Sequence, residues 1–290
     1  MTIKIASRSS KLALKQVEIF SKAFLLKDYK LVEVLTSGDK MSAKGKVMFD
    51  KANFVNEIEQ MIKKNSADIA IHSAKDMPAK ETKGLKHFYF IENQKRKVSD
   101  LIIFRNGTDA VFEKNMRLGT SSLRRSMQAK FHMDAKNIQL LNGNIDTRIK
   151  KLNDGLYDCI ILAEAGLSRL SSLLTEQNYK QLEHITCSGQ GVLAVQWKEG
   201  SKVENFIKSS RLFDQMKELN EQIKMERNLL KKLNADCNSA ISIFASDGFL
   251  QGEIFGKDKF ITFSGNNVDQ LYEDISANNG LNLLNEHNWY

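Results

Sequence analysis

The sequence predicts an α/β fold that is followed by a small α+β domain. Apolar runs of strand length alternate with helical stretches over the first ninety residues, in the order strand, helix, strand, helix, strand. The same alternation recurs between residues 101 and 162. Near the C-terminus, three segments with alternating apolar residues are typical of antiparallel strands. At 290 residues the chain is long enough for two or three domains with a sizeable core.

The first elements are a strand at residues 3–6 and a helix whose apolar stripe runs from Leu12 to Phe24. Ser9 or Ser10 is a suitable N-cap, and Arg8 lies between the strand and the helix. A helix start beside an arginine can bind an anion, although a plain N-cap with a solvated arginine explains the pattern equally well. After a strand at 31–35, the Lys-rich residues 40–52 are predicted to form a mobile loop that could act as a lid.

A helix over residues 54–62 leads into a buried, continuously apolar strand at 68–72. The chain then turns polar at Ser73, Lys75 and Asp76, and Pro78, the only proline, closes the segment. In open parallel sheets, ligands bind beyond the carboxyl ends of the strands. Asp76 beside Lys75 therefore indicates either an acid/base or ligand-orienting site or a surface turn with a local ion pair.

The second α/β stretch begins with a strand at 101–104 and continues through Thr120-Ser-Ser122 into a helix whose first turn holds Arg124 and Arg125. The helix dipole disfavours cations at this end, so two arginines here suggest an anion between them. We expect that anion to be a ligand rather than the helix face to be merely solvated. Strands are predicted at 138–141 and 159–162.

Three further features complete this stretch. Asp146 is expected to cap a short helix that carries Arg148, and Cys159 is expected to be plain core. Residues 171–186 are polar, with helical fragments, and precede a turn at Gly189-Gln190-Gly191 and a strand at 192–195. The two glycines permit positive φ, so this turn is expected to provide backbone geometry where the chain crosses between domains.

The C-terminal part begins with a long amphipathic helix, or a broken pair of helices, over residues 212–233. Strands are predicted at 240–245, 249–255 and 260–263, with Asp247-Gly248 as a hairpin turn, and a closing helix follows from Val268 to Ile275. Cys237 stands in a polar loop ahead of these strands. A loop cysteine can be inert, but Cys237 is the best nucleophile candidate in the chain.

Composition limits the class of protein. A hydrophobic content of 42% is ordinary for a globular protein, and no apolar run approaches the roughly 18 residues of a membrane span. The start has no secretion signal, and three cysteines, Cys159, Cys187 and Cys237, are too few and too widely spaced for a disulfide framework or a zinc cluster. We therefore expect a cytoplasmic protein without a metal site or membrane contact.

The net charge of +8 is compatible with nucleic acid, a membrane surface or an acidic small molecule. Lysines are scattered over the chain without interleaved aromatic residues, which argues against a nucleic-acid groove. Arginine is the rarer basic residue, yet Arg124, Arg125 and Arg148 lie close together in the sequence. Its planar guanidinium binds carboxylates or phosphates bidentately, so an acidic small molecule is favoured.

Seven stretches together resemble the porphobilinogen deaminase family, also called the hydroxymethylbilane synthases, nearly from end to end. The matching segments are residues 5–14, 67–78 (ADIAIHSAKDMP), 118–125 (LGTSSLRR), 143–148 (GNIDTR), 165–170, 189–191 and 226–237 (ERNLLKKLNADC). The longer patterns are specific, and their order and spacing fit as well.

The resemblance implies two α/β domains like those of solute-binding proteins, with a central cleft, plus a small C-terminal α+β domain. Domain 1 would comprise residues 1–94 and 187–211, domain 2 residues 95–186, and domain 3 residues 212–290. The implied activity joins four porphobilinogen molecules head to tail, with release of ammonia, to give the linear tetrapyrrole hydroxymethylbilane of haem biosynthesis. The growing chain would be anchored on a dipyrromethane cofactor through a thioether bond. The protein is expected to be a monomer.

Motif by motif, the resemblance also implies the roles of individual residues. Asp76 would be the catalytic acid, with Lys75 as its partner. The positions implied to bind the cofactor are Cys237 (covalently), Arg124, Arg125, Ser73, Lys75, Asp76, Thr120, Ser122 and Asn144. Those implied to bind substrate are Arg8, Ser10, Arg148, Arg169, Phe54 and Gln190. Each pyrrole carries an acetate and a propionate, which accounts for the clustered arginines found independently.

Some positions depart from the family pattern. Asn142 and Ser99 stand where the family often has arginine, Glu164 replaces a small apolar residue, and Ala235-Asp236 replace two glycines before Cys237. These departures bear on details of the site. The alternative to the transferase is a non-catalytic two-lobed binding protein for an anionic small molecule. Such a protein has no need of a third domain with a loop cysteine.

Overall fold

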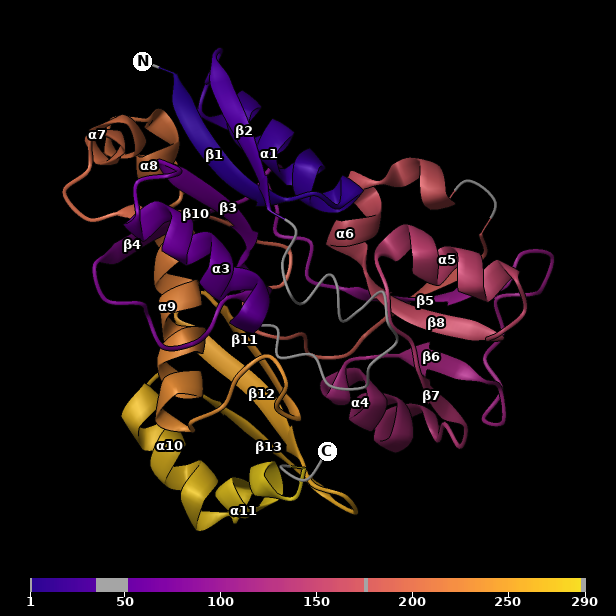
Figure 1. The fold of residues 1–290 in the computed structure, drawn as a ribbon. Helices are drawn as coiled ribbons and strands as arrows, with labels where there is room; N and C mark the ends of the chain where they lie inside the picture. The colour runs from indigo at the N-terminus through magenta and orange to yellow at the C-terminus, as the bar shows by residue number, and fades with distance from the viewer. Residues whose placement is uncertain (1, 35–51, 175–176, 288–290) are drawn as a thin grey trace. The chain divides into compact units, whose positions relative to one another are not determined.

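The structure is a computed structural model that describes residues 2–34, 52–174 and 177–287, with the side chains of residues 52–54 and 174 left out. The chain divides into two compact units (Figure 1). Unit 1 comprises Met1–Arg96, Ser188–Cys237 and Ala245–Gly248, and unit 2 comprises Lys97–Cys187, Asn238–Phe244 and Phe249–Tyr290. The division into three domains stays a prediction.

Unit 1 is built on a five-stranded sheet with the order β2-β1-β3-β10-β4. Strand β1 pairs in parallel with both β2 and β3, whereas β10 is antiparallel to both β3 and β4. The parallel sheet expected for the first ninety residues is therefore correct for three strands, and the whole sheet is mixed. The strands are β1 (Ile3–Arg8), β2 (Tyr29–Val34), β3 (Ile69–Ser73), β4 (Leu85–Phe90) and β10 (Leu193–Lys198).

Helix α1 (Lys11–Ala23) shows why the N-terminal pattern folds as predicted. Ser10 is its N-cap, and the Ser10 Oγ accepts a hydrogen bond from the Ala13 N–H at 3.3 Å. The apolar stripe is buried, because Val17, Phe20 and Phe24 pack with strands β1, β3 and β4 in one core cluster. The other helices of unit 1 are α3 (Ala52–Lys63), α7 (Lys202–Lys208), α8 (Arg211–Gln215) and α9 (Lys217–Lys232).

Unit 2 contains a second five-stranded sheet, with the order β7-β6-β8-β5-β9. Strand β6 is parallel to β7 and β8, and β5 is antiparallel to β8 and β9. Each sheet thus has a parallel half and one strand that runs against its two neighbours. The strands are β5 (Asp100–Phe104), β6 (Leu118–Thr120), β7 (Ile138–Leu140), β8 (Cys159–Ala163) and β9 (Tyr179–Leu182). The helices are α4 (Leu123–Met133), α5 (Ile145–Asn153) and α6 (Glu164–Arg169), with a 3₁₀ turn at Ser171–Leu174.

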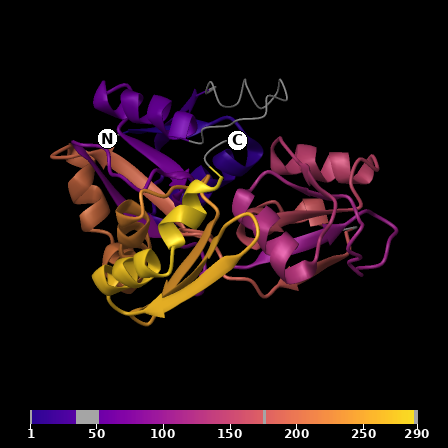
Figure 2. The same ribbon diagram turned by 90° about the horizontal axis from the view of Figure 1, so that it is seen from below.

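A three-stranded sheet near the C-terminus has the order β11-β12-β13, from β11 (Ile241–Ser246), β12 (Phe249–Phe255) and β13 (Phe260–Gly265). Strands β12 and β13 are antiparallel, as predicted. Asp247 and Gly248 both have positive φ, which confirms the hairpin turn. Helices α10 (Val268–Ala277) and α11 (Gly280–Asn285) cover one face of this sheet (Figure 2).

The structure corrects several local expectations. The N-cap of α5 is Asn144, and Asp146 lies inside the first turn, where a carboxylate still favours the helix dipole. The polar stretch 171–186 contains strand β9. This strand lies at the edge of the sheet, so most of its residues are exposed and polar, and it lacks the apolar pattern by which strands are predicted. The stretch 212–233 is a broken pair, α8 and α9. The predicted loop at 40–52 lies outside the described residues up to residue 51.

Candidate active site

In unit 1, the carboxyl ends of the parallel strands β1 and β3 bring three predicted site residues to one edge of the sheet. Arg8 ends β1, Ser73 ends β3, and Ser10 caps α1 directly after β1. The Gln16 Nε2 of α1 donates a hydrogen bond to the Ser73 Oγ at 2.8 Å, so the helix is fastened to the strand end. This is the edge at which open α/β sheets bind ligands.

The turn after β3 is a 3₁₀ helix, Ala74–Asp76, and it leaves Lys75 and Asp76 partly exposed while Ala74 is buried. The Ala74 N–H donates to the Val192 carbonyl at 2.9 Å. Gly189 has φ +70° and lies so close that a Cβ there would stand 2.8 Å from the Lys75 N. The predicted need for glycine geometry is confirmed, and its reason is this close approach.

Two neighbouring residues of α9, Glu226 and Arg227, hold these loops in place. The fully buried Glu226 carboxylate accepts from the Gly189 N–H at 2.8 Å and from both Arg96 Nη atoms at 2.7 and 3.3 Å. Arg227 donates to the carbonyls of residues 74, 77 and 78, on the turn that carries Asp76. Sequence reasoning gave these two residues no role, because nothing in their local spacing shows which distant loops they reach.

Gln190, between the two glycines, is also fixed. Its carbonyl accepts from Arg96 Nε at 2.8 Å, and its Oε1 lies 3.4 Å from Lys75 Nζ. The glycine turn and the Lys75–Asp76 turn are therefore joined by side chains as well as by packing. Gln190 is fully buried, so its amide orders Lys75 from the protein side.

His72, in β3, lies beneath this turn in a buried hydrogen-bonded row. Its Nε2 is 3.2 Å from Gln196 Oε1, and the Gln196 Nε2 donates to Glu59 Oε1 at 2.8 Å. Burial lowers the pKa of His72 to about 4, against weaker opposing effects of Gln196 and Asp76. The imidazole is thus neutral at physiological pH, and since Gln196 Oε1 is an acceptor, Nε2 is the protonated nitrogen.

Cys237 follows α9 in a short loop and is partly exposed. Asn234 in this loop has φ +51°, and Ala235 is buried with its N–H bonded to the Leu230 carbonyl at 2.9 Å. Cys237 belongs to the same compact unit as Asp76. Cys159, by contrast, is fully buried in β8, and burial raises its pKa to about 12, which confirms it as core.

In unit 2, Arg124 and Arg125 share the Asp100 carboxylate at the start of β5. Arg124 Nη2 donates to Asp100 Oδ2 at 2.8 Å, and Arg125 binds the same carboxylate through Nε at 3.1 Å and Nη2 at 2.7 Å. All three side chains are nearly completely buried. Burial opposes the charge on Asp100, but the two arginines outweigh it and hold the pKa of this carboxyl far below its usual range.

The anion expected between the two arginines therefore exists, and it is a residue of the protein. The prediction of a ligand was drawn from the cost of two cations at a helix N-terminus, and Asp100 offsets that cost without a ligand. Sequence reasoning could not pair residues that are 24 and 25 positions apart. One donor is still unused, because Arg124 Nε is buried and has no hydrogen-bond partner among the described residues.

Except for Arg169, the other predicted residues of unit 2 lie at strand ends or helix starts beside the same sheet. Thr120 ends β6 and is buried, and its Oγ1 accepts from the N–H of Ser122, the N-cap of α4. Asn144 caps α5, and Arg148 Nε donates to the Gly143 carbonyl at 2.7 Å. Arg169 is buried in the last turn of α6, where a cation favours the helix dipole.

The positions that depart from the family pattern have ordinary partners in the structure. Lys151 Nζ donates to the Asn142 carbonyl at 3.0 Å, which places a cation beside Asn142. Glu164 lies 3.7 Å from Lys97 Nζ, and Ser99 Oγ accepts from Gln181 Nε2.

The structure thus gathers the predicted residues in two groups. Arg8, Ser10, Ser73, Lys75, Asp76, Gln190 and Cys237 belong to unit 1, and Thr120, Ser122, Arg124, Arg125, Asn144, Arg148 and Arg169 belong to unit 2. The side chain of Phe54 lies outside the described part of the chain.

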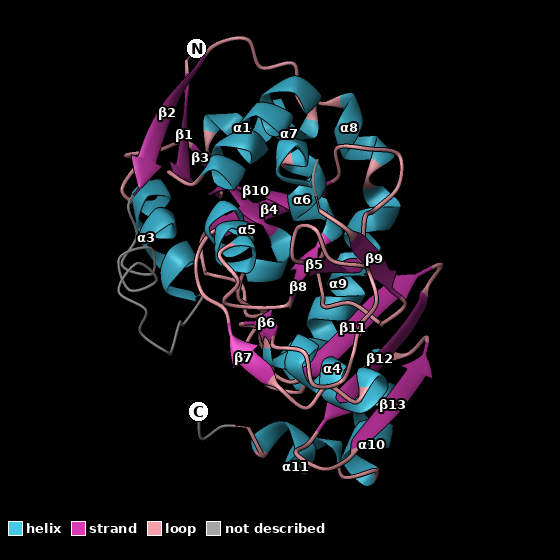
Figure 3. Cartoon of the chain, turned by 90° about the vertical axis from the view of Figure 1, so that its right-hand side faces the viewer, coloured by secondary structure: helices cyan, strands magenta, loops and turns pink. Residues whose placement is uncertain are grey.

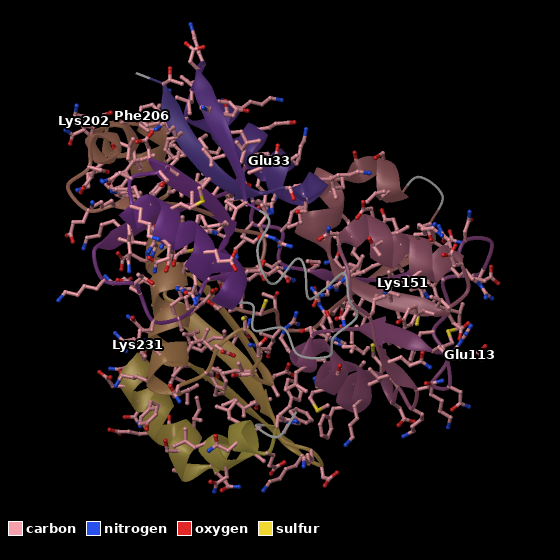
Figure 4. All side chains as sticks on the ribbon, viewed as in Figure 1. Glu33, Glu113, Lys151, Lys202, Phe206 and Lys231 are labelled. Carbon is pink, nitrogen blue, oxygen red and sulfur yellow. The ribbon has the colours of Figure 1, made fainter. Side chains whose placement is uncertain are left out.

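The lysines labelled in Figure 4 lie on separate elements. Lys202 starts α7, Lys231 lies in the last turn of α9 and Lys151 lies in α5. That spread gives no support to a nucleic-acid groove. Within the described ranges, no helix is long and apolar enough to cross a membrane, and His, Cys, Asp and Glu form no metal-binding group of three or more.

Each of the two α/β sheets has arginines and capped helix starts near its strand ends, and such groups can bind carboxylates or phosphates. A family model described as "Porphobilinogen deaminase, dipyromethane cofactor binding domain" matches residues 3–205. The chain belongs to the porphobilinogen deaminase family.

Named relatives agree over most of their length. The porphobilinogen deaminase of Streptococcus sanguinis (strain SK36) is 34% identical over 289 residues, which cover 93% of each chain. That of Buchnera aphidicola subsp. Acyrthosiphon pisum (strain Tuc7) is 32% identical over 306 residues, 98% of this chain and 96% of the relative. The probable porphobilinogen deaminase of Methanocaldococcus jannaschii is 33% identical over 233 residues, 80% of this chain and 75% of the relative.

Solved structures give more distant likenesses. A sulfate-bound mutant regulatory domain of OxyR2 from Vibrio vulnificus has a TM-score of 0.44 at 13% identity and covers 74% of this chain and 96% of its own. The GluR0 ligand-binding core in complex with L-glutamate has a TM-score of 0.41 at 10% identity, and the match covers 79% of this chain and 92% of the GluR0 chain. Neither likeness bears on what this chain binds.

Proposed function

We propose that this chain is a transferase that joins four porphobilinogen molecules head to tail, with release of ammonia, to form hydroxymethylbilane. The observation that carries the proposal is the Lys75–Asp76 turn. It stands at the ligand-binding edge of the first sheet and is fixed from behind by Gly189, Gln190 and Arg227. Family membership supplies the reaction, and this turn supplies a reactive carboxylate on a rigid support.

The reaction needs a fixed negative charge that can also carry a proton. In each cycle the C–N bond of the aminomethyl group breaks, ammonia leaves, and a new C–C bond forms to a pyrrole ring carbon, which then loses its proton. Positive charge develops on the pyrrole nitrogen meanwhile. The Asp76 carboxylate would accept a hydrogen bond from that N–H, stabilise the charge and take part in the proton transfer. Lys75, held by Gln190, would supply a positive charge on the same turn.

The residues present also fit a dipyrromethane cofactor, which carries four carboxylates. Arg124 Nε is a buried donor that has no hydrogen-bond partner in the described part of the chain, as a site for an acidic group would leave it. Arg125, Thr120, Ser122 and Asn144 would provide further donors. Cys237, partly exposed on its loop, would hold the group through a thioether bond. When bound, dipyrromethane supplies the ring carbon to which the first substrate unit is joined.

The remaining assignments follow the same proposal. Arg8, Ser10, Arg148, Arg169, Phe54 and Gln190 would bind the acetate and propionate groups and the rings of the substrate. The enzyme would work as a cytoplasmic monomer with the three domains predicted from the sequence.

Intact mass spectrometry of the purified protein tests the covalent anchor. We expect an adduct of dipyrromethane mass that is lost in Cys237→Ser and kept in the matched variant Cys187→Ser. An active preparation with unmodified mass would refute the anchor.

A second measurement tests the catalytic carboxylate. Asp76→Asn should keep the thermal unfolding transition while slowing porphobilinogen consumption by about 10²–10⁴-fold, the usual contribution of a positioned acid or base. Activity near that of the wild type would remove Asp76 from its role.

A further inference from the structure

A stripe of polar residues runs along one face of α4, one turn apart: Arg124, Gln128 and His132. This face meets Glu253 of strand β12, in the C-terminal sheet of the same unit (Figure 3). The stripe therefore connects the C-terminal sheet to an arginine that the proposed function assigns to the cofactor.

Glu253 is a buried carboxylate with three hydrogen-bond donors. Gln128 Nε2 donates to its Oε2 at 2.9 Å, the Ser242 Oγ donates to the same oxygen at 3.0 Å, and His132 Nε2 lies 2.8 Å from Oε1. Only 7% of Glu253 is exposed. A carboxylate at such a position is costly unless it is hydrogen-bonded, and these contacts offset that cost while they hold the carboxylate in one orientation.

Gln128 is oriented by what it contacts. Its Nε2 donates to both Glu253 Oε2 and the Ile185 carbonyl, the latter at 2.8 Å, so the nitrogen must face these two acceptors. Its Oε1 then faces the other way and accepts from Arg124 Nη1 at 2.7 Å. The Glu253 carboxylate and the Ile185 carbonyl together prevent the Gln128 amide from flipping its nitrogen and oxygen. Without Glu253, only the Ile185 carbonyl would do so.

Arg124 is in turn held on two sides. Nη1 donates to Gln128 and Nη2 to Asp100, which fixes the plane of the guanidinium, and no described residue accepts a hydrogen bond from Nε–H. The side chain of Cys187, a weak acceptor, is also near this guanidinium. A carboxylate ligand would therefore meet Nε–H, and the hydrogen bonds of Nη1 and Nη2 fix the direction in which this donor points.

We propose that Glu253 and Gln128 are positioning residues that orient the Arg124 guanidinium for a carboxylate of the cofactor or substrate. This proposal rests on the proposed function for the identity of the ligand. Attachment of α4 to the sheet does not require the polar residues, because Phe131 of α4 packs against Phe255 and Phe260 with ring centroids 6.0 and 5.3 Å apart. The polar row serves to orient Arg124.

The first test reads the orientation of Arg124 without any assay of activity. In ¹⁵N-labelled protein, the Arg124 Nε–H resonance, assigned by its loss in Arg124→Lys, should exchange slowly with water. In Gln128→Met we expect its exchange to accelerate at least about tenfold, because Nη1 loses its acceptor. Ser242→Ala removes a donor to Glu253 but leaves the Gln128–Arg124 bond, so exchange should stay as in the wild type. Equal exchange in Gln128→Met and the wild type would overturn the proposal.

The second test reads binding. Gln128→Met and Glu253→Gln should each raise the KM for porphobilinogen about five- to tenfold while kcat changes less than about threefold, since the lost contact serves binding. Gln128→Glu alone would bring two carboxylates together. Combined with Glu253→Gln it restores an acceptor for Arg124 and a donor from position 253, but the Ile185 carbonyl still lacks its donor, so KM should fall below that of Gln128→Glu without reaching the wild-type value.

The outcomes separate the two proposals. A wild-type protein that neither consumes porphobilinogen nor carries the adduct refutes the proposed function, whereas the exchange measurement still decides the orientation of Arg124. A normal wild-type protein whose Gln128→Met variant has both an unchanged KM and an unchanged fraction of the dipyrromethane adduct refutes the positioning role. The role is also refuted if Ser242→Ala raises KM as much as Gln128→Met does.

Discussion

Replacement of Gly189 by alanine would test how tightly the glycine turn and the Asp76 turn fit together. The added Cβ would stand 2.8 Å from the Lys75 N, 2.9 Å from the Ala74 C and 3.0 Å from the Ala74 Cβ. Ordinary contact begins at 3.4 Å, so 3.4 minus 2.8 leaves an overlap of about 0.6 Å that the backbone of one turn must absorb. Neither neighbour is the flexible end of a side chain.

Gly200 provides the matched control, because it has nearly the same backbone conformation and an open surrounding. Its φ is +71°, against +70° for Gly189, and nothing lies within 4 Å of a Cβ built there. Alanine at positive φ costs roughly 1–2 kcal/mol, offset by about 0.4–1 kcal/mol because alanine restricts the unfolded chain. Gly200→Ala should therefore destabilise the protein by about 1 kcal/mol or less and leave turnover unchanged.

Gly189→Ala carries the same backbone cost and the overlap in addition. Overpacking of this kind costs about 1–3 kcal/mol, so the total should reach about 2–4 kcal/mol. A misplacement of 1 Å can cost about 10²-fold in rate, so a shift of half that size should slow turnover about tenfold. Urea unfolding and the initial rate of porphobilinogen consumption, measured on both variants, check these values. Equal rates for the two variants would refute the claim that Gly189 sets the position of Asp76.

Two further predictions concern buried charge. Because burial lowers the pKa of folded His72 to about 4, below the usual value of 6.5, the unfolded chain binds more protons between these pH values and stability falls as pH falls. Between pH 6.5 and pH 5, the free energy of unfolding should fall by about 2 kcal/mol more in the wild type than in His72→Gln. An equal fall in both proteins would contradict this prediction. Glu226→Gln should cost about 3–5 kcal/mol, because Arg96 would lose its buried partner. The exposed pair Lys150–Asp154 is its control, and Asp154→Asn should cost less than about 1 kcal/mol in the same urea titration.

Local sequence patterns predicted the elements that position the site. The apolar run ending at Ser73, the cap at Ser10 and the hairpin at Asp247-Gly248 are encoded within a few residues, and the structure confirms each. Such signals depend on backbone conformation and burial of neighbouring residues, which a short window contains.

The parts that could not be predicted depend on contacts between distant residues. Arg96 and Glu226 are 130 positions apart, and Gln128 and Glu253 are 125 apart. No spacing rule links such pairs, because the topology alone brings them together. The pairing of Asp100 with Arg124 and Arg125 shows the consequence, since a charge pattern that correctly predicted an anion could not tell whether the protein provides it.

The place of β10 in the first sheet has a consequence for how the protein is made. This strand lies between β3 and β4, and its residues 193–198 leave the ribosome only after the whole second sheet has been synthesised. Until then β4 has no neighbour to join it to β3, and the Ala74 N–H lacks its acceptor at Val192. The second sheet, contiguous from residue 100 to residue 182, has no such delay. We therefore expect the sheet whose synthesis begins first to be completed last, and the turn that carries Asp76 to become ordered only when translation has passed residue 198.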